Sequence, residues 1–258
     1  MSPISWTRAA TACQRRAASW FGRRPLTLSR GPAIVSFTFD DFPRSALVNG
    51  GSTLESFGLA GTFYTSLGLA GQQAEGGPMF ALEDLPGLLT RGHELGCHTF
   101  DHCPAWETPT TAFTDSVERN RKALQRYVPQ ADFHTLSYPI SYPRPATKRA
   151  VAPFFSGCRG GGQRSNIGTV DLNYLSAFFL EQSRDNLAVV AQLIDNNRHT
   201  DGWLIFATHD ITGRPTRYGC TPGFFKEVVL LAIESGAKIL PVGKACEMLR
   251  RRAFPDYD

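Results

Sequence analysis

Hydrophobic residues in this chain recur in short runs, separated by longer stretches that have a helical spacing. The clearest run, from Ala33 to Phe39, is rich in β-branched and aromatic residues and stops at Asp40, Asp41 and Pro43, which is typical of a buried strand. Comparable runs predict further strands at residues 61–65, 94–98, 133–138, 154–158, 175–180, 203–208 and 237–242. Between them we expect helices at about residues 44–57, 81–92, 110–128, 144–151, 184–199, 222–235 and 243–252.

The alternation of strands and helices predicts an α/β fold with parallel strand pairing and helices on the outside. We therefore expect a distorted TIM-like (β/α) barrel of seven to eight parallel strands, with an open doubly wound sheet as the alternative. There is no internal repeat, low-complexity tract or shift of composition after residue 33. Residues 33–258 are accordingly predicted to form one domain.

Residues 1–32 differ from the rest and are interpreted as a basic amphipathic leader with a linker. Apolar residues recur there at intervals of three and four, which predicts a helix that ends before Gly22; Pro25 and the pair Gly31-Pro32 indicate the linker. The apolar positions are Trp6, Ala9, Ala10, Cys13, Ala17, Trp20 and Phe21, with Arg8, Arg15 and Arg16 largely between them. Residues 1–24 are expected either to make peripheral contact with an anionic membrane surface, to pack on the domain, or to form a disordered tail.

The charge distribution supports the division between the leader and the rest of the chain. The net charge is +4, but residues 1–39 hold six arginines and no acid, whereas the remainder holds 21 basic and 23 acidic residues. A mildly acidic domain argues against nucleic-acid binding, and the absence of an apolar run of about 18 residues argues against an integral membrane protein. The six cysteines lack CxxC spacing and the leader lacks a secretory apolar region, so we expect reduced thiols and a cytoplasmic location, with the leader at the inner membrane surface as an alternative.

Acidic and histidine residues follow three of the predicted strands. These are Asp40 with Asp41, His98 with His102, and His209. Reactive groups of such barrels lie at the carboxyl ends of the strands, so these residues are expected to meet. His98 and His102 are four residues apart, close enough on one helical turn to bind one ion, and an Asp with two His forms the ligand set of a catalytic metal.

The same residues carry a resemblance to a known family. Thr38-Phe-Asp-Asp41, His98-Thr-Phe-Asp-His102 and Thr208-His-Asp210, in this order, resemble the polysaccharide deacetylases with a NodB-homology domain, carbohydrate esterase family 4. The resemblance covers about residues 33–248 and implies metal-dependent removal of an acetyl group from an N-acetylated sugar. It implies that Asp41, His98 and His102 bind the metal, that Asp40 is the general base and that His209 is the general acid.

The third motif of the family departs from its usual form. Where Arg-Pro-Pro-Tyr is common, this chain has Ser137-Tyr-Pro-Ile140, so the arginine that orients the base is missing. Tyr138 and Pro139 resemble a variant of the motif, and the main-chain N–H of Ile140 still suits an oxyanion. Arg144 or Arg159 is expected to replace the arginine.

Other parts of the site are less well marked. Glu181, or less clearly Asp171, is a candidate for the acid that orients the catalytic histidine. The segment from Gly157 to Gly162 is either a loop that lets a sugar approach the backbone or a simple turn. Aromatic residues near the motifs are candidates for stacking on sugar rings: Phe42, Trp106, Tyr138, Tyr142 and Tyr218.

The sequence thus predicts a metal-dependent hydrolase that removes N-acetyl groups from a glycan or a lipid-linked amino sugar. Zinc is the first expectation for the metal, and cobalt, nickel or iron suits the same ligands. Two alternatives stay open at this point. The changed third motif leaves room for hydrolysis of another non-peptide C–N bond, such as a cyclic amide or formyl group, and the barrel is also compatible with a catalytically idle glycan-binding module.

Overall fold

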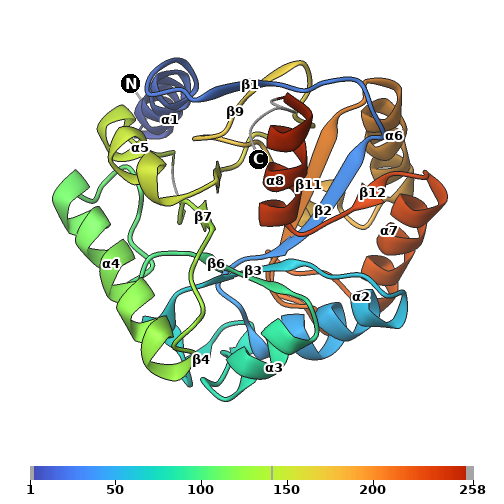
Figure 1. Cartoon of the computed structure of the whole chain (residues 1–258), viewed down its shortest axis with the longest axis horizontal. Coiled ribbons are helices and arrows are strands. Elements are labelled where there is room, and N and C mark those ends of the chain that lie inside the picture. The colour runs from blue at the N-terminus through green and yellow to red at the C-terminus, as the bar shows by residue number, and fades with distance from the viewer. Residues whose placement is uncertain (1–2, 141, 254–258) are drawn as a thin grey trace.

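The predicted strands form a curved parallel sheet with helices around it (Figure 1). The computed structural model describes residues 3–140 and 142–253, and for residues 3–10 the backbone alone. The sheet has the strand order β10-β11-β2-β3-β6-β7-β8, with β12 also paired to β2. Its strands are β2 (Ile34–Phe39), β3 (Thr62–Thr65), β6 (Glu94–Cys97), β7 (Thr135–Ser137), β8 (Gly157–Arg159), β10 (Phe178–Phe179), β11 (Trp203–Thr208) and β12 (Lys238–Ile239).

The sheet curls until its two edges approach each other. On one edge, Arg159 of β8 forms a parallel bridge with Leu175, which precedes β10 on the other edge by three residues. Every residue of the central strands β2 and β11 is buried, as expected for parallel strands covered on both faces. The prediction of a distorted (β/α) barrel with seven to eight parallel strands is confirmed.

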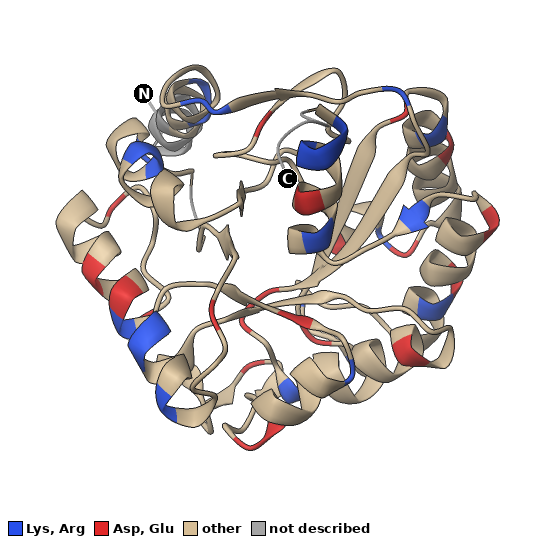
Figure 2. Ribbon diagram, in the orientation of Figure 1, with Lys and Arg blue, Asp and Glu red and all other residues tan. Residues whose placement is uncertain are grey.

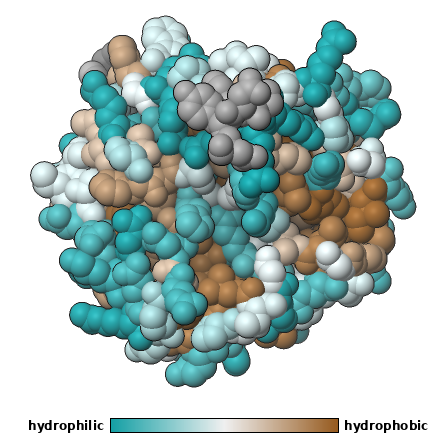
Figure 3. Space-filling view, in the orientation of Figure 1, coloured by the Kyte–Doolittle hydropathy of each residue, from teal (hydrophilic) through white to brown (hydrophobic). Residues whose placement is uncertain are grey.

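Helices lie outside the sheet where the amphipathic stretches predicted them, except that the predicted 44–57 helix is split between a π-helical turn, η1 (Ala46–Gly51), and a short α-helix. Hydrophilic side chains cover most of the face seen in Figure 3, and hydrophobic ones gather over α7 at its right-hand side. The α-helices are α1 (Pro3–Trp20), α2 (Ser52–Ser56), α3 (Asp84–Thr90), α4 (Thr110–Tyr127), α5 (Pro145–Val151), α6 (Leu187–His199), α7 (Pro222–Glu234) and α8 (Val242–Ala253).

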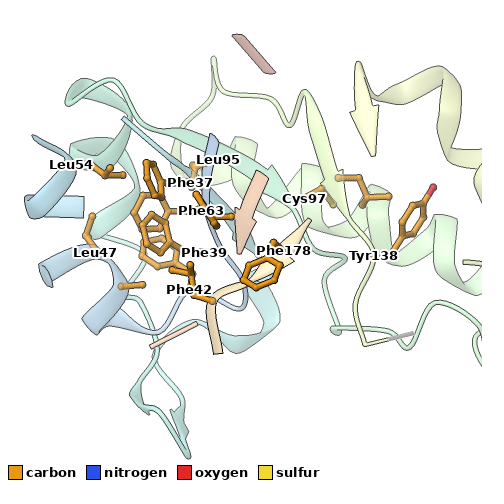
Figure 4. Packing of buried hydrophobic residues seen from close by; sticks show 14 of the residues in the cluster. Phe37, Phe39, Phe42, Leu47, Leu54, Phe63, Leu95, Cys97, Tyr138 and Phe178 are labelled. Carbon is orange, nitrogen blue, oxygen red and sulfur yellow. The ribbon is translucent and has the colours of Figure 1, made fainter. Parts of the chain in front are cut away.

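Aromatic packing behind β2 and β3 gives the site a rigid base (Figure 4). Phe39 and Phe63 stack with ring centroids 4.5 Å apart, and Phe42 stacks on Phe80 at 4.7 Å. Gly50 lies so close to Phe39 that an added Cβ would come within 2.7 Å of the ring. Because each buried phenyl ring contributes about 1.5–3 kcal/mol, this cluster fixes the end of β2, where Asp40 and Asp41 follow.

Two further ribbons were not predicted from the sequence. The expected linker contains β1 (Pro25–Thr27), which pairs antiparallel with β9 (Thr169–Asp171), and β4 (Gln73–Ala74) pairs with β5 (Gly77–Pro78) in a hairpin. The segment expected to be a linker thus includes a short strand. Strands of two or three residues are too short to show a hydrophobic period, and only Leu26 of β1 is buried.

The helix predicted in the leader is confirmed, and its end packs on the barrel. Ala18 is fully buried, and the Lys148 ammonium of α5 donates to the carbonyl oxygens of Ala18 at 2.5 Å and Phe21 at 3.0 Å. The same ammonium pairs with the Asp171 carboxylate at 2.6 Å, and the Lys148 side chain is fully buried. Packing on the domain was one of the three expectations for this segment; the apolar positions predicted at Trp6, Ala9 and Ala10 lie outside the described side chains.

Two general expectations bear on the rest of the chain. All six cysteines are free thiols, and none joins a disulfide in the described structure. Within residues 3–140 and 142–253, no helix has both the length and the hydropathy that a membrane span requires.

We predict that Lys148→Met lowers the free energy of unfolding by about 3 kcal/mol, because removing one partner leaves the buried Asp171 carboxylate without its cation. Thermal melting measures the loss, and limited proteolysis measures release of α1. Arg149→Met, at an exposed neighbouring position of α5, is the matched control. Equal melting temperatures and equal proteolysis of the two variants would contradict the role of the pair.

Candidate functional site

The acids and histidines singled out from the sequence meet at one edge of the sheet. Asp40 and Asp41 follow β2, His98 follows β6 and His209 follows β11, and these strands are close neighbours in the order β11-β2-β3-β6. The backbone N–H of Asp40 donates to the Thr208 oxygen at 2.9 Å, which continues the pairing of β2 with β11 beyond the strand. Carboxyl ends of parallel strands therefore bring the groups together, as the barrel predicts.

Asp41, His98 and His102 form a group suited to bind a metal. Their ligand atoms all lie within 4.8 Å of one another. Asp41 Oδ1 lies 3.3 Å from His98 Nε2 and 2.9 Å from His102 Nε2. Two ligands bound tetrahedrally at about 2.1 Å would lie about 3.4 Å apart, so the spacing fits an ion such as zinc with little rearrangement.

The protonation of His98 is set by its second nitrogen. His98 Nδ1 lies 2.8 Å from the carbonyl oxygen of Ser137, which can only accept, so Nδ1 carries the proton and Nε2 presents a lone pair toward Asp41. This is the arrangement in which a histidine binds metal through Nε2. Ser137 thus contributes to the site through its main chain.

The 98–102 segment adopts a different conformation from the expected one. It is a bend rather than a helical turn, and Thr99 and His102 have positive φ angles of 59° and 52°. The imidazole centroids of His98 and His102 are nonetheless 5.0 Å apart. The spacing was interpreted correctly, but the helical turn was wrong, because strand β6 leads directly into a tight loop.

Left-handed backbone is concentrated around the site. Asp41, Phe42 and Ile140 have φ near 60° in addition to Thr99 and His102. Such angles are unfavourable for bulky or β-branched residues and persist where the surrounding packing imposes them. Phe42 is held by its stacking on Phe80, so the strained turn after β2 is supported by the core.

The adjacent carboxylate, Asp40, is paired with Arg159. Asp40 is buried, and Arg159 Nη2 donates to its Oδ1 and also to Ser137 Oγ, the latter at 2.6 Å. The guanidinium lies over the ring of Tyr64, 4.9 Å from its centroid. Burial raises the pKa of Asp40, but the charges of Arg159 and the two nearby histidines outweigh this effect and hold the pKa below its usual value.

Of the two expected replacements for the family's arginine, only Arg159 reaches Asp40. Arg144 instead donates to the carbonyl oxygens of Trp106 and Glu107. Ser137 and Arg159 lie opposite each other in the pairing of β7 with β8. The family motif would have its arginine at position 137, so in this chain the guanidinium comes from the neighbouring strand.

Asp41 and His102 influence each other strongly. Burial raises the pKa of Asp41, yet the imidazoles of His102 and His98 beside the carboxylate bring it far below the usual value. Burial lowers the pKa of His102, and Asp41 more than compensates, so that pKa is raised. The carboxylate thus attracts positive charge to this point, whether as protons on imidazoles or as a metal ion.

His209 approaches the other carboxylate oxygen of Asp41. Its Nε2 is 4.0 Å from Asp41 Oδ2, and its ring lies between Phe179 and Tyr218, at centroid distances of 6.4 and 5.4 Å. Its buried Nδ1 and the buried Oε2 of Glu181 both lack a hydrogen-bond partner among the described residues.

The two candidates for the acid that orients His209 have different surroundings. Burial raises the pKa of Glu181, and the positive charge of His209 opposes that rise. Asp171, in contrast, accepts hydrogen bonds from Lys148 and from the main chain of Arg24 and Asn173. Asp171 is thus committed to holding α1, and Glu181 is the candidate that lies near His209.

One cavity of about 710 Å³ is lined by the metal-ligand trio together with Asp40, Arg159, Glu181 and His209. Ile140 lies at its rim and is 75% exposed. The carbonyl of Pro139 accepts from Ala105 N, and the Tyr138 hydroxyl donates to the Asn173 oxygen. The lining residues are Arg15, Asp40, Asp41, His98, His102, Tyr138, Ile140, Tyr142, Arg159, Gly160, Gly161, Gly162, Gln163, Tyr174, Phe179, Glu181, His209 and Tyr218.

The aromatic candidates for stacking on sugar rings differ in their exposure and in whether they line the cavity. Phe42 is fully buried, so the suggestion that it stacks on a sugar ring was wrong. Tyr138 lines the cavity, but only 5% of it is exposed. Trp106 is not among the residues that line this cavity. Tyr142 and Tyr218 line it and remain candidates.

Four residues of the cavity wall were not predicted from the sequence: Arg15, Gln163, Tyr174 and Phe179. Phe179 belongs to a predicted strand, which could have indicated its place near the site. Arg15 belongs to the leader, and nothing in the sequence indicated that it would reach the cavity. Within the glycine run, Gly160 is required by Tyr174, because a Cβ on Gly160 would come within 2.1 Å of the Tyr174 ring.

Comparison with known proteins agrees with the geometry. The sequence profile of the family "Polysaccharide deacetylase" matches residues 28–153. A search of curated proteins finds no match.

Similar solved structures have the same fold at low sequence identity. A family 4 acetyl xylan esterase from Clostridium thermocellum, in complex with a cobalt ion, is 16% identical, covers 83% of this chain and 91% of its own, and has a TM-score of 0.59. A mutant of the peptidoglycan deacetylase PdaC from Bacillus subtilis is 13% identical, with coverages of 86% and 93% and a TM-score of 0.57. A family 4 pseudoenzyme from Bacillus anthracis is 12% identical, with coverages of 84% and 66% and a TM-score of 0.59.

The family profile and the fold thus support the resemblance seen in the motifs. Residues 28–153 match the polysaccharide deacetylase family, and the barrel as a whole has the fold of carbohydrate esterase family 4.

Proposed function

We propose that the protein is a metal-dependent hydrolase that removes N-acetyl groups from a glycan or a lipid-linked amino sugar. The observation that carries this proposal is the meeting of a metal-ligand trio, a buried carboxylate and a histidine in one cavity of about 710 Å³. An idle binding module would need no acid and base beside a metal site, so the complete set favours catalysis. The peptidoglycan deacetylase among the similar structures is consistent with an amide substrate.

Asp41, His98 and His102 would hold the metal, and their chemistry suits zinc first and cobalt, nickel or iron next. When bound, such an ion lowers the pKa of water to about 7 and polarises a carbonyl. Asp40, beside the trio, accepts the proton of the attacking water. His209, on the opposite side of Asp41, donates a proton to the departing sugar amine, and the main-chain N–H of Ile140 donates to the carbonyl oxygen as it gains negative charge.

Arg159 acts as a positioning residue in this scheme. It keeps Asp40 ionised and fixes the carboxylate through a charge-assisted hydrogen bond, while Ser137 Oγ accepts a second bond from the same nitrogen. Glu181 is proposed to orient His209 through Nδ1, since both have a buried unpartnered atom. The cytoplasmic location and the contact of residues 1–24 with the inner membrane surface stay predictions.

Metal binding is tested on the full-length protein by elemental analysis and thermal melting. We expect about one equivalent of divalent metal, and stabilisation of about 2.7 kcal/mol at a metal concentration 100 times the Kd. Asp41→Ala and His98→Ala should lose both effects because each removes a ligand. Asp101→Asn, an exposed acid between the two histidines, should keep both. Undiminished metal in both ligand variants would refute the site.

The reaction is tested by release of acetate and free amine from N-acetylglucosamine oligomers and from lipid-linked amino sugars. We expect hydrolysis by the metal-loaded wild type, and a loss of at least about 100-fold in kcat for Asp40→Asn and His209→Gln. Acetylated xylan, cyclic imides and ureides are assayed in parallel. Hydrolysis confined to the ester or to the cyclic amides would reject N-deacetylation, and no turnover of any substrate would support the idle module.

The role of Arg159 is tested by moving its guanidinium. Arg159→Met should lower kcat by about 100-fold with little change in KM, because the base loses its orientation and not its contact with substrate. The double variant Ser137→Arg, Arg159→Ser restores the family's arrangement across the same pair of strands and should recover part of kcat. A double variant no better than Arg159→Met, although equally well folded by circular dichroism, would contradict this assignment.

A further inference from the structure

The leader helix contributes to the wall of the catalytic cavity. Arg15, in the last turns of α1, lines the same cavity as Asp40, Asp41 and His209. Its position is fixed by Ala18, which is fully buried one turn later and whose carbonyl accepts from Lys148. Arg15 is exposed and has no ion-pair partner within the part of the chain that the structure describes. Its charge is therefore available to a molecule that enters the cavity.

Tyr174 lines the same cavity as Arg15 and presents an unused donor. The residue is 9% exposed, and its buried hydroxyl has no hydrogen-bond partner in the described residues. Burial raises the pKa of this hydroxyl, while the nearby guanidinium groups of Arg164, Arg159 and Arg15 oppose that rise. The group stays a neutral O–H that can donate.

A second cavity of about 470 Å³ continues from this point. It shares Tyr174 and Gln163 with the catalytic cavity, and Arg23 and Arg164 line it. Asp171 is the acid among its described lining residues, and the buried ammonium of Lys148 already neutralises it. Figure 2 shows basic residues on α1 and on the neighbouring α5. The space on both sides of Tyr174 is therefore positively charged, in contrast to the acidic end of the catalytic cavity.

We propose that α1 forms one wall of the substrate cleft and that Arg15, Arg164 and the Tyr174 hydroxyl bind a negatively charged group of the substrate. This inference rests on the proposed function in taking the substrate to be an amino sugar. A phosphate or a carboxylate on the sugar matches these donors, since guanidinium groups bind such oxyanions through charge-assisted hydrogen bonds. The acetamido end of the same sugar would then reach Asp41 in the shared cavity.

Binding is measured by calorimetry on the metal-loaded full-length protein. The probes are N-acetylglucosamine 1-phosphate, N-acetylmuramic acid and neutral N-acetylglucosamine. We expect the wild type to bind at least one charged probe about tenfold or more tightly than the neutral one. Arg15→Ala should lose most of this preference, about a tenfold change, as for one charge-assisted hydrogen bond. Higher salt should weaken the preference, because the arginines are exposed.

Arg16→Ala is the matched control, because Arg16 is the next exposed arginine of α1 and lines neither cavity. Both substitutions place alanine in a helix, which favours the fold. Tyr174→Phe should lower the affinity for the charged probe alone. The phosphate and carboxylate probes separate the two sources of charge.

Equal affinity for charged and neutral probes, or equal behaviour of Arg15→Ala and Arg16→Ala, overturns the inference. The deacetylation assay keeps this failure distinct from failure of the proposed function. Turnover without dependence on Arg15 rejects the anion site alone, and Arg15-dependent binding without turnover rejects the deacetylase alone.

Discussion

Two adjacent carboxylates at the end of a buried strand can both stay ionised only if positive charge reaches each of them. Asp40 and Asp41 meet this requirement with partners from different parts of the barrel. Arg159 approaches Asp40 from β8, and the imidazoles of His98 and His102 approach Asp41 from the loop after β6. Like charges this close would otherwise force one group to protonate. The separation of their partners gives the two acids different surroundings, which is the basis for proposing one as a base and the other as a ligand.

The strand order explains how a few loops bring the residues of the site together. β2 lies beside β11 and is separated from β6 by β3 alone, so that three loops supply Asp41, His98 and His209 within a few ångströms. The phenylalanine cluster under β2 and β3 carries the strain of the left-handed turn at Asp41 and Phe42. The packing of the core therefore determines the geometry of the site at this end of the barrel.

The positions of the site residues at the ends of strands could be predicted from local sequence. A strand that ends in Asp40 and Asp41 can be recognised from its own residues, and the same is true for His98 and His209 at the ends of β6 and β11. The bend at Thr99 was not predictable, because its positive φ is imposed by tertiary packing. The selection of Arg159 over Arg144 depends on the register of β7 with β8, and the approach of Arg15 depends on a buried ion pair between Lys148 and Asp171. Such contacts between distant segments leave no periodic signal in the chain.

The pairing of Ser137 with Arg159 has a wider consequence for how such barrels diverge. Since the two residues are opposite each other on neighbouring parallel strands, a guanidinium can be transferred from one strand to the next while its charge stays at the same point in space. The exchange leaves Asp40 in its electrostatic environment, yet it removes the arginine from the linear motif. Evolution can thus conserve a charge at a location while the sequence position that supplies it changes, and relatives of this kind are better aligned by the contents of the cavity than by the order of their motifs.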